Sequence, residues 1–227
     1  AEVLMDTSVN QAKVSEAIEK EKVLSIVTTR YLAHERNYID YVLELYLGEI
    51  GRPELQNKLS YCIHELAGNA KKANTKRVFF QEKGLNILNP TEYHIGMQNF
   101  KEETVANIER YILMQEEAGL HVKFQFKREG RTLKIAVRNN TVLTKEENER
   151  IQQKLKLARG AESLPEIMEQ SEDYTEGAGL GLVMSIMMLR NLGISTDHFQ
   201  VLSRNGETYA VLYLAIPEQP IRKTPID

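Results

Sequence analysis

The sequence has very little cysteine and no long apolar run. Cys62 is the single cysteine of 227 residues, so no internal disulfide can form and we expect a reducing compartment. No stretch of about 18 apolar residues occurs, so we expect no membrane span. A basic segment followed by an apolar one is missing at the N-terminus, so we expect a cytoplasmic protein without a signal peptide. Because the chain starts at Ala1, we expect a processed form or a fragment of a longer protein.

An excess of basic charge is also missing. The net charge is -3 with both signs mixed along the chain, which argues against a nucleic-acid partner because such a partner needs a basic stripe. Hydrophobic residues make up 42% of the chain, enough for a real core. The length fits one large domain, or one domain with a smaller appendage.

The hydrophobic pattern predicts an α+β fold in which helices cover one face of a mostly antiparallel sheet of about four strands, a two-layer sandwich. We divide the chain into an N-terminal helical region at 1–52 that serves for dimerisation or as a linker, a main domain at 53–217, and a tail at 218–227. The predicted helices cover about 9–31, 34–47, 53–73, most of 75–120, 145–159 and a segment after Gly181. The predicted strands are 121–127, 132–138, 198–204 and 208–216.

The stretch "HELAGNAKKA", residues 64–73, places polar side chains on an otherwise amphipathic helix. Glu65 and Asn69 are one helical turn apart, and Lys72 lies on the same side. An amide oxygen suits Mg²⁺, a carboxylate can orient or deprotonate a hydroxyl, and an ammonium can neutralise phosphate. The same strip also fits a solvated helix face. Cys62, on the apolar side of this helix, is expected to be a small core residue.

The stretch "EGAGLGL", residues 176–182, alternates Gly177, Gly179 and Gly181 just before an apolar helix. Glycine permits close approach of the backbone, and a helix N-terminus offers N–H groups to an anion. These features indicate a phosphate cradle, although a flexible turn with tight helix packing explains them as well.

Together the two stretches resemble the N box and the G2 box of the GHKL (Bergerat-fold) ATPases, and within them the histidine-kinase ATP-binding domain. The order of elements between the boxes is also similar, and the resemblance covers roughly residues 53–217 with an unusual helical insertion at about 75–120. It implies a Mg-ATP-binding catalytic domain of a signal-transduction protein kinase that transfers the γ-phosphate of ATP to a protein side chain.

The resemblance also implies roles for individual residues. Glu65 would be the catalytic carboxylate, Asn69 would coordinate the Mg²⁺ that bridges the ATP phosphates, and Lys72 would contact phosphate. Residues 141–176 would form the lid, and Thr208 would lie beside the adenine. The residues bordering the triphosphate would be Gly177, Gly179, Leu180, Gly181 and Leu182.

One segment departs from the family pattern. The family has Asp-x-Gly-x-Gly after its second strand, where the Asp accepts a hydrogen bond from the adenine amino group. Here the stretch is "VRNNTVL", so that Asn139 stands at the Asp position while Thr141 and Leu143 replace the glycines. An Asn can still accept that bond through its amide oxygen. Asn140 is the alternative if the alignment is off by one residue.

The phosphoacceptor is left open by the sequence. His34, in "AHERN", has the His-Glu start of an acceptor motif, but the usual proline is missing and only about 30 residues separate it from Glu65. A surface or packing role fits His34 better, and His64 is expected to be structural. The acceptor is then a response regulator, another partner domain or an N-terminal histidine, and the first helix is compatible with a homodimer.

Other functions compete with a histidine-type kinase. An anti-sigma-like serine kinase would need no acceptor of its own. A degenerate nucleotide-binding regulatory module acting through protein partners would explain the altered "NNTVL" loop. An ATPase that drives conformational work, as in chaperones or topoisomerases, fits less well because those proteins carry additional transducer domains.

Overall fold

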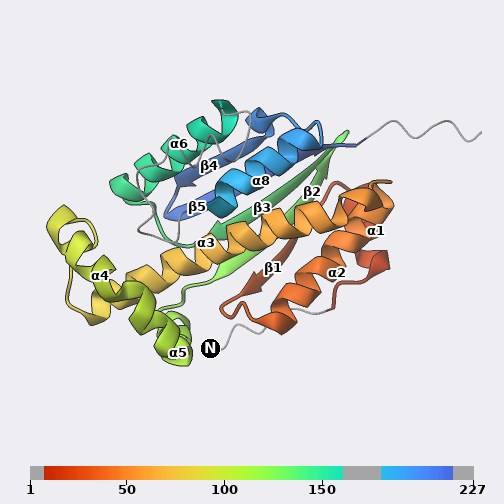
Figure 1. Ribbon diagram of the computed structural model, residues 1–227. Helices are drawn as coiled ribbons and strands as arrows, with labels where there is room; N and C mark the ends of the chain where they lie inside the picture. Colours follow the sequence, from red (N-terminus) through yellow and green to blue (C-terminus); the bar gives the residue numbers. More distant parts are fainter. Residues whose placement is uncertain (1–7, 161–179, 217–227) are drawn as a thin grey trace, which may run out of the picture.

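The computed structural model describes residues 8–160 and 180–216, which form an α+β fold (Figure 1). Its helices are α1 Gln11–Glu19, α2 Ala33–Glu49, α3 Gln56–Glu82, α4 Pro90–Ala106, α5 Ile108–Glu117, α6 Lys145–Gly160 and α8 Leu180–Asn191, with short 3₁₀ turns η1 Pro53–Leu55 and η2 Thr196–His198. Its strands are β1 Leu24–Thr28, β2 Val122–Glu129, β3 Thr132–Asn139, β4 Phe199–Arg204 and β5 Glu207–Ala215.

The five strands form one sheet in the order β1-β2-β3-β5-β4, and every neighbouring pair is antiparallel. Two hairpins, β2–β3 and β4–β5, supply most of this pairing. The second turns at Asn205 and Gly206, which have φ of 54° and 81°, the left-handed backbone that Asn-Gly adopts readily in a two-residue hairpin. The predicted α+β class and the four predicted strands are therefore confirmed, and the sheet has one strand more.

The additional strand corrects the prediction of one continuous helix over about 9–31. Helix α1 ends at Glu19, Glu21 adopts a φ of 48°, and Leu24–Thr28 then pairs with β2 as an edge strand. The segment "LSIVT" is rich in β-branched residues and buries Ile26 and Thr28 in alternation. Its strand character depends on hydrogen bonds to the free edge of β2, a partner about 100 residues away in the chain.

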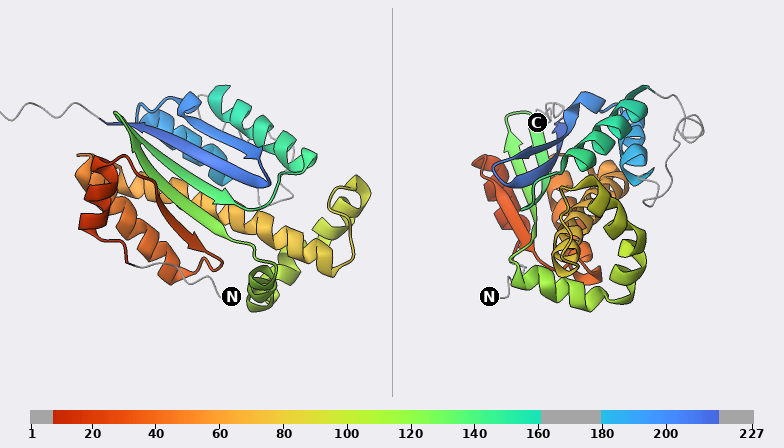
Figure 2. Two further views of the ribbon diagram at one scale, coloured as in Figure 1. Left: turned by 180° about the vertical axis from the view of Figure 1, so that it is seen from behind. Right: turned by 90° about the vertical axis from the view of Figure 1, so that its left-hand side faces the viewer.

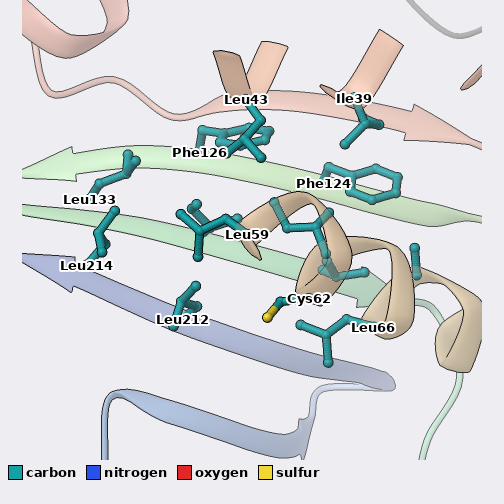
Figure 3. Close-up of a cluster of buried hydrophobic side chains, with 14 of the residues drawn as sticks. Ile39, Leu43, Leu59, Cys62, Leu66, Phe124, Phe126, Leu133, Leu212 and Leu214 are labelled. Atoms are coloured by element: carbon teal, nitrogen blue, oxygen red, sulfur yellow. The ribbon is translucent and has the colours of Figure 1, made fainter. Parts of the chain in front are cut away.

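The helices α2, α3 and α8 cover one face of the sheet, and the strands come to the front when the molecule is viewed from behind (Figure 2). Figure 3 shows how the inward side chains of β2 and β5, among them Phe124, Phe126 and Leu212, meet Leu59 and Cys62 of α3. Cys62 is buried in this core, as predicted, and burial raises the pKa of its thiol to about 11.

The N-terminal segment shares this core. On α2, Ile39, Val42 and Leu43 are fully buried, and the Tyr46 ring stacks on Phe126 of β2 at a centroid distance of 4.9 Å. The buried residues of this segment thus share one hydrophobic core with residues of the predicted main domain at 53–217.

A second, smaller cluster lies at the far end of α3, where the predicted helical insertion is formed by α4 and α5 (Figure 1). Helix α4 approaches α3 closely at Gly96, where an added Cβ would lie 2.5 Å from the Phe80 ring. The cluster is largely aromatic and consists of Val78, Phe79, Phe80, Tyr93, Phe100 and Tyr111.

Candidate functional site

One pocket collects most of the residues that the sequence singled out. It lies among α3, α6, α8 and the inward face of β3, β4 and β5. Leu180 is the first residue of α8 and is not part of the lining. Gly177, Gly179 and residues 161–176 of the lid predicted at 141–176 lie outside the described residues. The predicted residues that line the pocket are Glu65, Asn69, Lys72, Asn139, Gly181, Leu182 and Thr208.

Helix α3 supplies the polar wall because its residues 59–70 are anchored in the core. Leu59, Cys62, Ile63 and Leu66 are buried at helical spacing, which turns the other side of the helix away from that core. The pocket lining on α3 consists of Glu65, Leu66, Asn69, Ala70, Lys72, Ala73 and Lys76.

The carboxylate of Glu65 lies directly against the first turn of α8. A Cβ added to Gly181 would fall 1.7 Å from Glu65 Oε2 and 2.4 Å from its Cδ, so the absence of a side chain at residue 181 makes room for the carboxylate. The N-terminal end of a helix favours a neighbouring negative charge. Gly181 therefore accommodates a side chain of the protein itself, which the sequence pattern alone did not indicate.

Helix α6 forms the opposite wall and is tied to α3 by a buried carboxylate. Thr144 and Glu147 make a capping box at its start: the Glu147 backbone N–H donates to Thr144 Oγ1 at 3.1 Å, and the Thr144 N–H donates to Glu147 Oε2 at 3.0 Å. Arg77 of α3 donates to both oxygens of Glu147, at 3.2 and 2.7 Å. Burial raises the pKa of Glu147. The hydrogen bonds and charge of Arg77, together with the charge of Lys76, lower it by more than burial raises it, so the pKa of Glu147 lies below its ordinary value.

The pocket lining includes several cationic side chains that the sequence analysis missed. Lys76 is 5% exposed; its Nζ donates to the Tyr93 hydroxyl at 2.8 Å and lies 3.7 Å from Glu147 Oε1. The guanidinium of Arg150 lies 5.4 Å from the centroid of the same Tyr93 ring. Lys154 follows one turn further along α6. The signal was present as spacing: Lys76 is one turn beyond Lys72, and 150 and 154 share a face of α6 with 147.

Strands β3 and β5 contribute neutral side chains to the pocket lining. Asn139, at the end of β3, is paired across the sheet with Thr208 of β5. The Asn139 amide Nδ2 donates to Asn74 Oδ1 at 3.1 Å and to Thr141 Oγ1 at 2.5 Å. The Thr208 hydroxyl donates to the Thr141 carbonyl at 2.7 Å. Val137, on β3 like Asn139, adds apolar surface to the pocket lining.

Of Asn139 and its alternative Asn140, only Asn139 lines the pocket. Asn140 does not line the pocket, because its amide is used on the other side of the strand end: Oδ1 accepts from the His121 backbone N–H at 2.8 Å, and Nδ2 donates to the Gly119 carbonyl at 2.9 Å. Of the two asparagines, Asn139 is therefore the one placed to meet a ligand in the pocket.

Neither histidine of interest lines the pocket. His34, near the start of α2, has a side chain that is 76% exposed and lies 3.8 Å from Glu35. His64 is enclosed between α2 and α3, where its Nε2 lies 2.9 Å from Asp40 Oδ1 and its Nδ1 contacts the Tyr31 hydroxyl. His64 thus joins three segments of the fold and is placed to support the helix that carries Glu65.

The described residues contain no group of three or more His, Cys, Asp or Glu side chains that could hold a metal ion. Glu65 and Asn69, the oxygen donors of the pocket that suit a metal on α3, lie one turn apart, whereas both oxygens of the pocket carboxylate Glu147 accept from Arg77. Mg²⁺ is usually held by one or two protein oxygens with waters and substrate phosphates completing its shell, so this donor set fits Mg²⁺ arriving with a phosphate ligand and does not fit a metal held by protein alone.

The fold and the pocket thus define an α+β domain with a charged, partly apolar pocket between its helices and the end of its sheet. An uncharacterized protein of Treponema pallidum (strain Nichols) is 39% identical over 207 residues, which cover 91% of this chain and 40% of that protein. The chain therefore spans about 40% of the length of the relative it matches. No family model matches the chain, and no solved structure matches it. Across residues 8–160 and 180–216, none of the helices combines the length and the apolar character needed to cross a membrane.

Proposed function

We propose that this chain is a Mg-ATP-binding catalytic domain of the GHKL (Bergerat-fold) class, a signalling kinase of the histidine-kinase type. The proposal is supported most by the fact that the predicted site residues come from separate segments of the chain and meet at one pocket. Residues chosen from two separate motifs, together with Asn139 and Thr208 from two strands, line a single pocket. A solvated face of α3, the alternative explanation of the polar strip, gives no reason for Gly181 to make room for Glu65.

The neutral and the charged side chains of the pocket suit the two parts of a nucleotide. The neutral strand residues, Asn139, Thr208 and apolar Val137, fit a planar base that carries a hydrogen-bond donor. Asn69 and Lys72 offer a metal ligand and a cation to phosphate oxygens. When bound, Mg²⁺ would neutralise charge on the phosphates. Glu65, held against the N-terminus of α8, is placed to orient or deprotonate the hydroxyl or imidazole that accepts the phosphate.

The packing of α2 bears on the phosphoacceptor. Because Ile39, Val42 and Leu43 are fully buried against the sheet, α2 is not available as one arm of a separate acceptor hairpin. We therefore place the acceptor on a partner domain or partner protein and not on residues 8–52. The same observation keeps the anti-sigma-like serine kinase as the second candidate, since such a kinase also acts on a separate protein.

Isothermal titration of Mg-ATP into the protein tests nucleotide binding. We expect saturable binding to the wild type and a loss of affinity of at least about tenfold in Asn69→Ala, because the variant lacks an oxygen ligand for the metal. Asn57→Ala is the matched control, an exposed asparagine on the same helix but outside the pocket. Absence of binding by a folded wild type would overturn the proposal.

Transfer of label from γ-labelled ATP separates a kinase from a degenerate regulatory module. We expect Glu65→Gln to retain nucleotide binding and to lose phosphate transfer or release, because the amide cannot take up a proton. Binding without transfer or phosphate release by the wild type, in the presence of Mg²⁺, would instead favour a nucleotide-binding regulatory module.

A further inference from the structure

Asn74 is the one polar residue of α3 that is completely buried, with 0% exposure. It lies one turn beyond Ala70 and does not line the pocket itself. Its amide is placed between the His121 carbonyl, which accepts from Asn74 Nδ2 at 3.1 Å, and Asn139, which donates to Asn74 Oδ1 at 3.1 Å. A buried amide with both ends occupied has a fixed orientation.

The direction of this chain of hydrogen bonds is dictated by chemistry. A backbone carbonyl can only accept, so Asn74 must turn its Nδ2 toward His121 and its Oδ1 toward Asn139. Asn139 must then present Nδ2 to Asn74, and the same Nδ2 group also reaches Thr141 Oγ1. The polar atom of Asn139 that is left for a ligand in the pocket is therefore Oδ1, an acceptor.

Thr208 is restricted in the same way. Its hydroxyl hydrogen is used by the Thr141 carbonyl at 2.7 Å, so that its oxygen offers lone pairs to the pocket. Asn139 and Thr208 are cross-strand partners, and both line the pocket. These two side chains consequently present acceptors and no donor to the pocket, although an asparagine and a threonine could each in principle do either.

We propose that Asn74 is a positioning residue that turns Asn139 into a substitute for the family's aspartate, and that the pocket thereby selects a purine with an amino group at position 6. This inference rests on the proposed nucleotide-binding function and deepens it. A 6-oxo purine would place its own acceptor against Asn139 Oδ1 and leave both oxygens without a hydrogen, which costs a site more than a missing apolar contact.

The test compares ATP with inosine triphosphate, which has an oxygen in place of the 6-amino group. We expect the wild type to bind Mg-ATP at least about tenfold more tightly than Mg-ITP. Asn74→Leu removes the fixed acceptor that orients Asn139 and leaves it the Thr141 hydroxyl, which can donate as well as accept. The amide can then rotate to donate to the 6-oxygen, so the preference for ATP should fall by about tenfold. Asn140→Leu is the control: it loosens the same 119–121 segment but leaves Asn139 held.

A second substitution that restores the preference for ATP in Asn74→Leu distinguishes a positioning role of Asn74 from a general structural role. An aspartate presents an acceptor in either orientation and needs no neighbour to orient it. Asn139→Asp combined with Asn74→Leu should therefore restore the preference for ATP. Asn139→Asp alone should bind ATP more weakly than this double variant, because its carboxylate would face Asn74 Oδ1. A structural defect caused by Asn74→Leu would not be repaired by the second change.

The outcomes separate the two proposals. If the folded wild type binds neither nucleotide, the proposed function fails, and this inference fails with it. If the wild type binds Mg-ATP and Mg-ITP equally well, nucleotide binding stands, but the proposal that Asn139 selects the 6-amino purine is wrong. This comparison needs no variant. If the wild type prefers ATP and Asn74→Leu, shown to be folded by circular dichroism, keeps that preference, then Asn74 has no positioning role. The same conclusion follows if the double variant fails to restore the preference.

Discussion

The two ends of α3 belong to two different hydrophobic clusters, and the comparison between them shows how the pocket is supported. The N-terminal part, with Leu59 and Cys62, packs in the large core against the sheet and α8, and it carries Glu65 and Asn69. The buried apolar side chains of the C-terminal part, among them Phe79, pack in the small aromatic cluster with α4 and α5, while Arg77 pairs with Glu147 of α6. The large core fixes elements that are distant in the sequence, whereas the small cluster is built from residues 78–111 alone.

This difference teaches that the α3 wall of the pocket and the insertion depend on separate hydrophobic packing, with a polar junction between them. The junction includes Lys71, whose Nζ donates to the Thr29 carbonyl at 2.5 Å and to Gln115 Oε1 at 2.8 Å. It also includes Lys76, which lines the pocket and donates to Tyr93 of the aromatic cluster. Variants on each side should therefore have local consequences.

The largest effect is expected from Phe79→Ala. The Phe79 ring is 1% exposed and meets Phe100 edge to face at 5.3 Å, so its removal should lower the free energy of unfolding by about 3–5 kcal/mol. Hydrogen exchange should show the loss of protection mainly in α4 and α5. Leu59→Ala, in the large core, should cost about 2–5 kcal/mol and expose the sheet and α8 as well. Equal loss of protection throughout the molecule in both variants would contradict two separate clusters.

A pair of glycines sharpens the comparison. Gly96→Ala would push a methyl group into the rigid Phe80 ring, and we expect it to lower the free energy of unfolding by about 1–3 kcal/mol. Gly181→Ala meets the flexible end of Glu65 instead, which can move aside. Denaturant unfolding should therefore show a smaller loss for Gly181→Ala, while phosphate transfer under the proposed function should fall in this variant only. A reversed order of stability would contradict the contacts at both glycines.

Lys71, at the junction between the two parts of α3, makes the free energy of unfolding depend on pH. Burial lowers the pKa of Lys71 to about 8, an effect opposed by the charge of Glu116 and reinforced by that of Arg30. Between pH 8 and 10.5 the unfolded chain therefore holds more protons at this residue than the folded protein, so the free energy of unfolding contributed by Lys71 rises with pH.

Denaturant unfolding of the wild type and of Lys71→Met at pH 7, 8, 9 and 10 measures this contribution. The difference, wild type minus variant, should be flat up to about pH 8 and then increase by at most about 1.4 kcal/mol per pH unit. A difference that falls with pH would show that Lys71 is held charged by its neighbours and is not penalised by burial.

The smallest effect concerns the start of α6. Thr144→Ala removes the hydroxyl that caps the helix and should lower the free energy of unfolding by about 1 kcal/mol. Thr144→Ser keeps the acceptor and is the matched control. Thermal unfolding should rank the wild type and the serine variant together above the alanine variant. Equal losses in both variants would mean that the threonine methyl group, and not the cap, stabilises α6.

Much of this architecture could be predicted from the sequence because it depends on local periodicity. The 3.6-residue spacing of Leu59, Cys62, Ile63 and Leu66 defined α3 and its buried side, and the alternation in 121–138 defined a hairpin. The strand β1 was missed because its five residues follow a helix without a glycine or proline between them, and its pairing partner is distant in the chain.

The candidate site divides in the same way. The sequence by itself determined that Glu65, Asn69 and Lys72 share one face of a helix, because that follows from helical geometry alone. Only the tertiary structure decided that Gly181 would meet Glu65, that Asn139 and not Asn140 would face the pocket, and that Asn74 would fix its orientation. Those contacts join residues from different elements, and their hydrogen-bond directions depend on partners that approach one another only after the sheet and helices have packed.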